Sequence, residues 1–109
     1  MIRRPAEAVQ SLVKQYLDHV SRRDHKKIYA AIIEMARRGP YPNPERYGDL
    51  GDGIYELKVA QHRLPFFYDG QGVIVLTHGF FKTQQRASPI EIRRAKELRE
   101  LYNERYGWR

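Results

Sequence analysis

The sequence contains no cysteine among its 109 residues. Disulfide bonds, thiolate zinc sites and cysteine nucleophiles are therefore excluded. The sequence also lacks a run of about 18 consecutive apolar residues, the length that a membrane-spanning helix requires. The first ten residues, MIRRPAEAVQ, do not contain the apolar stretch of a signal peptide. We therefore expect a soluble, cytoplasmic protein with no membrane partner.

Familiar metal-binding and catalytic motifs are absent as well. The histidines stand at positions 19, 25, 62 and 78 and form no HxxxH pair, so a zinc site would need acidic ligands from scattered positions. The chain contains no GxSxG, P-loop or GxGxxG motif. We therefore predict neither a metal ion nor a cofactor.

Acidic residues are the scarcer charge. Lysine and arginine number 20 against 13 aspartates and glutamates, which leaves a net charge of +7. A basic excess of this size indicates a polyanionic partner, such as nucleic acid or an acidic protein. The plain alternative is a soluble protein that happens to be basic.

Apolar spacing in the first third of the chain predicts a helical hairpin. A one-sided apolar stripe over Ala6–Val20 is typical of an amphipathic helix. A second stripe follows Asp24, its expected N-cap, and ends at Gly39-Pro40. Residues 39–53 are rich in proline and glycine and are expected to form a loop.

The middle of the chain has the alternating pattern of β-strands. We predict strands over Ile54–Val59, Arg63–Tyr68 and Val73–His78, with Asp69–Gly72 as a tight turn before the last of them. Because Pro65 cannot donate a hydrogen bond, it is expected to mark a bulge or a sheet edge. The strands should form an antiparallel meander of three strands or more.

The last element is a predicted helix over Pro89–Tyr106. It opens with the pattern of a capping box, in which Ser88 is the N-cap and Glu91 reaches back to it. The residues expected to be buried are Ile92, Ala95, Leu98 and Tyr102. The chain is therefore predicted to be a single α+β domain, residues 1–109, with helices packed on one antiparallel sheet.

Ionisable side chains gather on the predicted strands. Glu56 and Lys58 share one face of the first strand, Arg63 begins the second and His78 ends the third. Metal-free RNA cleavage needs a group that takes the proton from the ribose 2′-OH, cations that stabilise the phosphorane, and an acid for the leaving oxygen. Because DNA lacks the 2′-OH, such a site would select RNA.

Each of these residues has a structural alternative. Glu56 and Lys58 could form a weak ion pair on one face. Arg63 could pair with Asp69 or with a backbone carbonyl, and His78 could be a hydrogen-bonded residue at a strand end. The residues alone therefore predict a small basic domain that binds RNA, with RNA cleavage as the further hypothesis.

Several segments together resemble the RelE/ParE superfamily of bacterial toxins, and the HigB-like, phage-derived branch is the most similar. They cover roughly residues 10–105. The segments are Leu50–Lys58, Arg63 with the aromatic strand after it, Asp69-Gly70, Val75–Phe80 with Lys82, and Ser88–Ile92 with Ala95. The same resemblance implies an α+β fold of this size.

The resemblance implies the toxin of a type II toxin–antitoxin system, an endoribonuclease that cuts mRNA on the ribosome by 2′-OH attack without a metal. It implies that Glu56 and Lys58 are acid–base or phosphate-binding groups and that Arg63 stabilises the scissile phosphate. His78 is the fourth catalytic candidate. Further RNA-binding candidates are His62, Lys82, Arg86, Arg22, Arg23, Lys26 and Lys27.

The resemblance also implies two partners. One is a cognate antitoxin, expected to be HigA-like with a helix-turn-helix domain and to form a hetero-oligomer with this chain. The other is mRNA on the ribosome. Two alternatives remain open: a ParE-like inhibitor of DNA gyrase with the same fold, and a non-catalytic basic module that binds nucleic acid or a partner.

Overall fold

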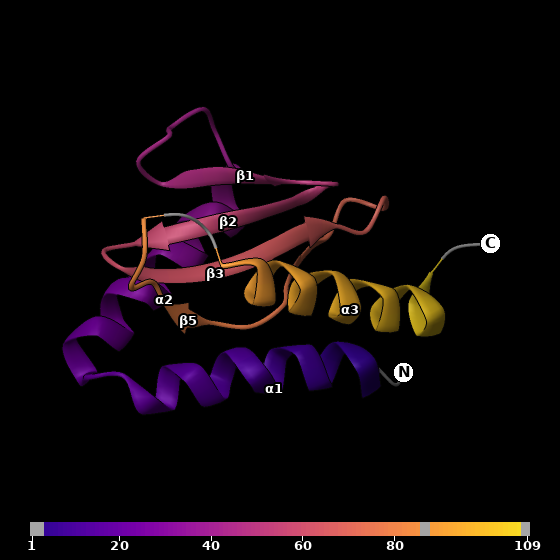
Figure 1. The fold of residues 1–109 in the computed structure, drawn as a ribbon, viewed down its shortest axis with the longest axis horizontal. Helices are drawn as coiled ribbons and strands as arrows, with labels where there is room; N and C mark the ends of the chain where they lie inside the picture. The colour runs from indigo at the N-terminus through magenta and orange to yellow at the C-terminus, as the bar shows by residue number, and fades with distance from the viewer. Residues whose placement is uncertain (1–3, 86–87, 108–109) are drawn as a thin grey trace.

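The computed structural model describes residues 4–85 and 88–107 and confirms the predicted α+β class. Two helices, α1 (Arg4–His19) and α2 (Arg22–Arg38), precede an antiparallel sheet, and α3 (Pro89–Tyr106) follows it (Figure 1). In this described part of the chain, no helix is long and apolar enough to cross a membrane.

The sheet has five strands, and every pairing in it is antiparallel. The strands are β1 (Tyr47–Gly51), β2 (Ile54–Val59), β3 (His62–Tyr68), β4 (Ile74–Leu76) and β5 (Phe80–Phe81). The order is β1-β2-β3-β4, and β5 pairs with β3 as well. The predicted meander is therefore confirmed, and the structure adds β1 beside β2 and the short strand β5, which returns to pair with β3.

Helices cover both faces of the sheet. Figure 1 shows α3 crossing in front of the sheet along β3, with α2 behind it. The core on the side of α1 and α2 contains Val13, Leu17, Ile28, Ala31, Met35, Leu57, Val59, Leu64 and Phe66. The core under α3 contains Ile54, Phe67, Val75, Ala95 and Tyr102. Because side chains alternate along a strand, this division places Glu56 and Lys58 on the α3 side of β2.

The prediction of a continuous loop over residues 39–53 is wrong, because Tyr47–Gly51 form strand β1. In the register with β2, Tyr47 lies opposite Leu57 and Gly48 lies opposite Glu56. Two glycines in five residues hide the alternation on which strand prediction depends. Pairing with the neighbouring strand β2 stabilises β1, although its own residues do not favour a strand.

The second helix begins earlier than predicted. Its N-cap is Ser21, whose Oγ accepts a hydrogen bond of 3.1 Å from the backbone N–H of Asp24. Asp24 is thus in the first turn and is not the cap. The predicted end is confirmed, since Gly39 has a positive φ of 72° and donates its N–H to the carbonyl of Met35.

Pro65 lies inside the central strand β3. The β2–β3 register runs through it without a break, with Glu56 opposite, so the bulge alternative is wrong. On the other side, the Pro65 carbonyl accepts the N–H of Thr77 at 2.9 Å, in the gap between β4 and β5. The missing N–H of Pro65 points to this same gap. The predicted third strand, Val73–His78, is accordingly shortened to β4.

The third helix has the predicted bounds but not the predicted capping box. Ser88 is the N-cap and Pro89 opens the helix, yet the Ser88 side chain makes no capping hydrogen bond to the described backbone. The Glu91 carboxylate instead lies 2.9 Å from Nε2 of His78. Ala95 and Tyr102 are buried as predicted, whereas Ile92 and Leu98 are half-buried.

Shortening a buried side chain of β2 in the core on the side of α1 and α2 should destabilise the whole domain. Leu57 is 0% exposed, so Leu57→Ala leaves a cavity and is expected to lower the free energy of unfolding by about 2–5 kcal/mol. Ile90, which is 68% exposed, is the control, and Ile90→Ala should change it by less than about 0.5 kcal/mol. Urea unfolding followed by circular dichroism measures both, and equal losses would contradict the burial of Leu57 in the core.

Candidate active site

A carboxylate and a guanidinium face each other on the α3 side of the sheet. Glu56 of β2 is buried, and its Oε1 lies 4.0 Å from Nε of Arg63 at the start of β3. The Arg63 side chain is itself mostly buried. Buried charges are kept in proteins when they are paired or hydrogen-bonded. The structure thus brings together two of the four predicted catalytic residues.

Backbone carbonyls hold the Arg63 guanidinium in place. Its Nη1 donates to the carbonyls of Ala60 at 2.7 Å and His62 at 3.0 Å. Ala60 has a positive φ of 54° in the turn between β2 and β3. The buried Nε has no hydrogen-bond partner within the described residues. Since a guanidinium carries five N–H donors, this anchoring leaves donors for a further acceptor.

Lys58 and Gly48 complete the surroundings of Glu56. Lys58 lies opposite Arg63 in the β2–β3 register, and its Nζ donates to the Pro44 carbonyl at 2.8 Å. A Cβ atom at Gly48 would stand 3.0 Å from Cε of Lys58 and 3.1 Å from Oε2 of Glu56. Glycine therefore leaves the space that both side chains occupy. Sequence reasoning missed Gly48 because it missed strand β1.

His78 belongs to a separate buried network. Its Nδ1 lies 2.9 Å from Oγ1 of Thr77, and its Nε2 lies 2.9 Å from Oε1 of Glu91 on α3. Thr77 lies beside Pro65, which in turn lies opposite Glu56, so two strand spacings of about 5 Å each separate Thr77 from Glu56. The structure therefore does not bring His78 into contact with Glu56.

Phe80 lies between the two networks. It is opposite Arg63 in the β3–β5 register, and its ring stacks on the His78 imidazole with centroids 5.7 Å apart. His78 and Glu91 thus hold the α3 N-terminus and the β4–β5 connection together beside Arg63.

Burial lowers the pKa of His78 below its ordinary value. The hydrogen bond and charge of the Glu91 carboxylate act against this shift by raising the pKa of His78. The positive charge of Arg94 lowers the pKa further. This shift favours the neutral imidazole at pH 7, with Nε2–H facing the Glu91 carboxylate. The Thr77 hydroxyl donates to the Pro65 carbonyl at 3.2 Å and also lies 2.9 Å from Nδ1 of His78.

His62 lies on the opposite face of the sheet from its neighbour Arg63. The Tyr16 hydroxyl is hydrogen-bonded to Nδ1 of His62 at 2.6 Å, and Nε2 of His62 lies 2.9 Å from Oδ2 of Asp24. Burial and the Asp24 charge raise the pKa of Tyr16, so the phenol stays protonated. His62 is buried and joins α1, α2 and β3. Its predicted contact with RNA stays a prediction.

The other RNA-binding candidates come from segments of the chain outside β2 and β3. Lys82 follows β5 and is half-buried, and its backbone N–H donates to the Gln61 carbonyl at 2.7 Å. Arg86 lies outside the described residues. The four candidates on α2 are exposed in its first two turns, and they are Arg22, Arg23, Lys26 and Lys27.

The arrangement suits the handling of a phosphate by fixed charges. A positioned arginine, a lysine and a carboxylate share the α3 side of the sheet, and fixed donors are the groups that stabilise a developing oxyanion. Between residues 12 and 107, leaving out 86 and 87, His, Asp and Glu side chains form no group of three or more that could hold a metal ion.

The fold and this site define a small α+β protein with a cation–carboxylate site on its sheet. Residues 15–100 match the family described as Phage derived protein Gp49-like (DUF891). The match covers well over half of the chain, and the chain belongs to this family, which is a RelE/HigB-like toxin family. No curated protein matches the chain at a significant level. The predicted toxin family is thus confirmed, and the HigB branch stays a prediction.

The His78 network should make stability depend on pH. Because the folded pKa of His78 lies below the unfolded value of about 6.5, the unfolded state binds more protons in this range. The contribution of His78 is therefore full above about pH 6.5 and is lost as the pH falls through the folded pKa. We expect His78→Asn to flatten the fall in unfolding free energy between about pH 7.5 and 5.

Urea unfolding at a series of pH values measures this slope. Glu91→Gln is the matched variant, because it keeps a hydrogen-bond acceptor for Nε2–H but removes the charge that favours the imidazolium. Its acid destabilisation should therefore extend to lower pH than that of the unmodified chain. Identical slopes for His78→Asn and the unmodified chain would contradict the burial-driven shift.

Proposed function

We propose that this chain is the toxin of a type II toxin–antitoxin system and that it acts as an endoribonuclease on ribosome-bound mRNA. Membership in the Gp49-like family supports the toxin part of the proposal. The observation that carries the nuclease part is the Glu56–Arg63 pair, in which backbone carbonyls hold a guanidinium beside a carboxylate.

In the proposed reaction the ribose 2′-oxygen attacks the adjacent phosphorus and the bond to the 5′-oxygen breaks, which leaves a 2′,3′-cyclic phosphate. Glu56 takes the proton of the 2′-OH. Arg63 stabilises the negative charge of the phosphorane through the donors that its two carbonyl contacts leave over. Lys58, on the same face as Glu56, gives a proton to the leaving 5′-oxygen.

We assign His78 a positioning role in this proposal. It is buried and bonded on both ring nitrogens, so it does not reach the reacting atoms in this arrangement. Through Phe80 it supports the strand that lies opposite Arg63. The exposed cations at the start of α2 would attract the polyanion from a distance, in a way that weakens with salt.

Removing the positioned cation should abolish cleavage. Arg63→Ala is expected to lower the cleavage rate by about 10²–10³-fold, because a fixed donor to the phosphorane is lost. Arg63→Lys keeps the positive charge but loses the planar guanidinium. Its cleavage rate should therefore lie between those of Arg63→Ala and the unmodified chain. Inducing each variant in bacteria and mapping transcript ends measures cleavage, with translated and untranslated copies of one reporter RNA to test ribosome dependence.

Arg37→Ala is the matched control. Arg37 is an exposed arginine on α2, and α2 covers the face of the sheet opposite the Glu56–Arg63 pair. It should cleave like the unmodified chain. Growth arrest with intact transcripts and trapped gyrase–DNA complexes would overturn the nuclease proposal in favour of a gyrase inhibitor. Full cleavage by a folded Arg63→Ala protein would remove Arg63 from the mechanism.

Filling the space at Gly48 should impair activity more than stability. Gly48→Ala places a methyl group against Glu56 and Lys58, which must then shift by a few tenths of an ångström. We expect cleavage to fall by about tenfold or more, because catalytic groups tolerate little displacement. The free energy of unfolding should stay within about 1 kcal/mol, because alanine suits a strand better than glycine. Unchanged transcript cleavage would place the reacting groups elsewhere.

A further inference from the structure

The backbone carbonyl of Lys58 lies where the pairing between β1 and β2 begins. The N–H of Lys58 donates to the carbonyl of Arg46 at 2.7 Å, so the Lys58 carbonyl points toward β1 as well. In a regular antiparallel pair, the N–H of Arg46 would donate to this carbonyl. The Arg46 N–H donates instead to the carbonyl of Asn43 at 2.9 Å, in the turn that precedes β1. The Lys58 carbonyl therefore receives no backbone N–H from Arg46.

The side chain of Arg46 supplies the missing donor. Its Nη1 donates to the Lys58 carbonyl at 2.7 Å. An unpaired carbonyl away from water costs about as much free energy as a lost hydrogen bond, so this contact stabilises the end of β2. Glu34 of α2 lines the same cavity as Arg46, but it pairs with Arg38 at 3.1 Å. The Lys58 carbonyl is thus the partner that orients the Arg46 guanidinium.

The turn that contains Arg46 also holds the Lys58 ammonium. Nζ of Lys58 donates to the carbonyl of Pro44 at 2.8 Å. The carbonyl of Asn43 accepts the N–H groups of Arg46 and Tyr47, both at 2.9 Å, and these bonds fix the shape of the turn. Lys58 is therefore held through its N–H, its carbonyl and its ammonium by one short segment of the chain.

The same end of β2 anchors the second cation of the site. Arg46 lines a cavity on the α2 side of the sheet together with Val59 and Ala60, the residues that follow Lys58. The carbonyl of Ala60 accepts from Nη1 of Arg63 at 2.7 Å. Ala60 has a φ of 54°, a conformation that a residue other than glycine keeps only when its surroundings impose it. A shift at the end of β2 would therefore move the support of Arg63.

We propose that Arg46 is a positioning residue of the charged site. From the α2 side of the sheet, its guanidinium fixes the end of β2 and thereby the Lys58 ammonium and the Arg63 guanidinium on the α3 side. Its effect on cleavage rests on the proposed function, whereas its effect on the geometry of Arg63 does not. Because Arg46 acts through other residues, its loss should lower the rate of the chemical step and leave RNA binding almost unchanged.

NMR of the full chain without RNA tests the geometry. The Nη–H signals of Arg63 should be resolved, because two backbone carbonyls restrict the rotation of the guanidinium. Arg46→Met removes the donors and keeps a long side chain, so the Arg63 signals should shift and merge as rotation becomes faster. Arg46→Lys keeps a donor for the Lys58 carbonyl and should restore most of the original spectrum.

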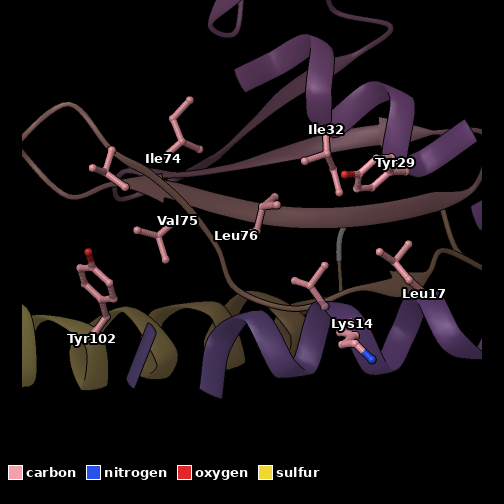
Figure 2. Close-up of a pocket in the computed structure, with 10 residues that line it drawn as sticks. Lys14, Leu17, Tyr29, Ile32, Ile74, Val75, Leu76 and Tyr102 are labelled. Atoms are coloured by element: carbon pink, nitrogen blue, oxygen red, sulfur yellow. The ribbon is translucent and has the colours of Figure 1, made fainter. Parts of the chain in front are cut away.

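Two control variants separate positioning from a general loss of stability. Arg38→Met removes another arginine from α2, one that pairs with Glu34 on the surface. Ile32→Ala shortens a side chain in the apolar cavity of about 400 Å³ between α1, α2 and β4 (Figure 2). It should lower stability without acting on the end of β2. Neither variant should change the Arg63 signals.

Cleavage on purified ribosomes that carry an mRNA tests the consequence. Arg46→Met should lower the rate at saturating ribosome concentration by about tenfold or more, because catalytic groups tolerate little displacement. The half-saturating concentration should stay within about twofold of its original value. Arg46→Lys should recover at least about a third of the rate. Ile32→Ala and Arg38→Met should cleave like the unmodified chain.

Each result supports or overturns the inference. Unchanged Arg63 signals in a folded Arg46→Met protein overturn it, and so does an unchanged cleavage rate. A raised half-saturating concentration at an unchanged rate overturns it as well, because Arg46 would then bind RNA directly.

The spectra also keep the inference separate from the proposed function. If the unmodified chain does not cleave, the nuclease proposal fails, but the spectra still decide whether Arg46 controls Arg63. If Arg46→Met does not fold, Arg46→Lys and Arg38→Lys replace it as a matched pair. Small shifts of the Arg63 signals are then expected for Arg46→Lys alone, and equal spectra overturn the inference.

Discussion

The buried contact of His62 with Tyr16 and Asp24 is the constraint on which much of the remaining structure depends. It ties the start of β3 to both helices of the hairpin through two hydrogen bonds on one imidazole. Because the next residue of a strand points to the opposite face, fixing His62 behind the sheet also fixes where Arg63 emerges in front. The His62 carbonyl then accepts directly from Arg63. A packing interaction on one face therefore sets the geometry of the charged site on the other.

Strand β3 carries this constraint along its length. Its residue Pro65 cannot donate to a neighbour, and β4 and β5 pair with β3 on either side of that position. The interruption lets Thr77 and His78 turn toward α3 and bond to Glu91. It also shortens β4 to three residues. One proline thus helps to shape the supports of Arg63.

The sequence was most informative where a pattern is local. The bounds of α3 follow from a proline at its start and from its own periodicity, and the strand pattern of β2 separated Glu56 from Leu57 correctly. Contacts between distant residues could not be read in this way. His62 and His78 stand out as polar residues in strands, but their burial depends on Tyr16, 46 residues away, and on Glu91, 13 residues away. The capping-box prediction failed for the same reason, because a distant histidine competes for the carboxylate.

Net charge alone does not separate RNA from an acidic protein as the partner, since both are attracted to a chain of +7. Geometry separates them. A phosphate at the Glu56–Arg63 pair needs a guanidinium held at a fixed angle, which two backbone carbonyls provide. Salt should therefore weaken the approach of a polyanion, while the two short hydrogen bonds keep the orientation of the guanidinium.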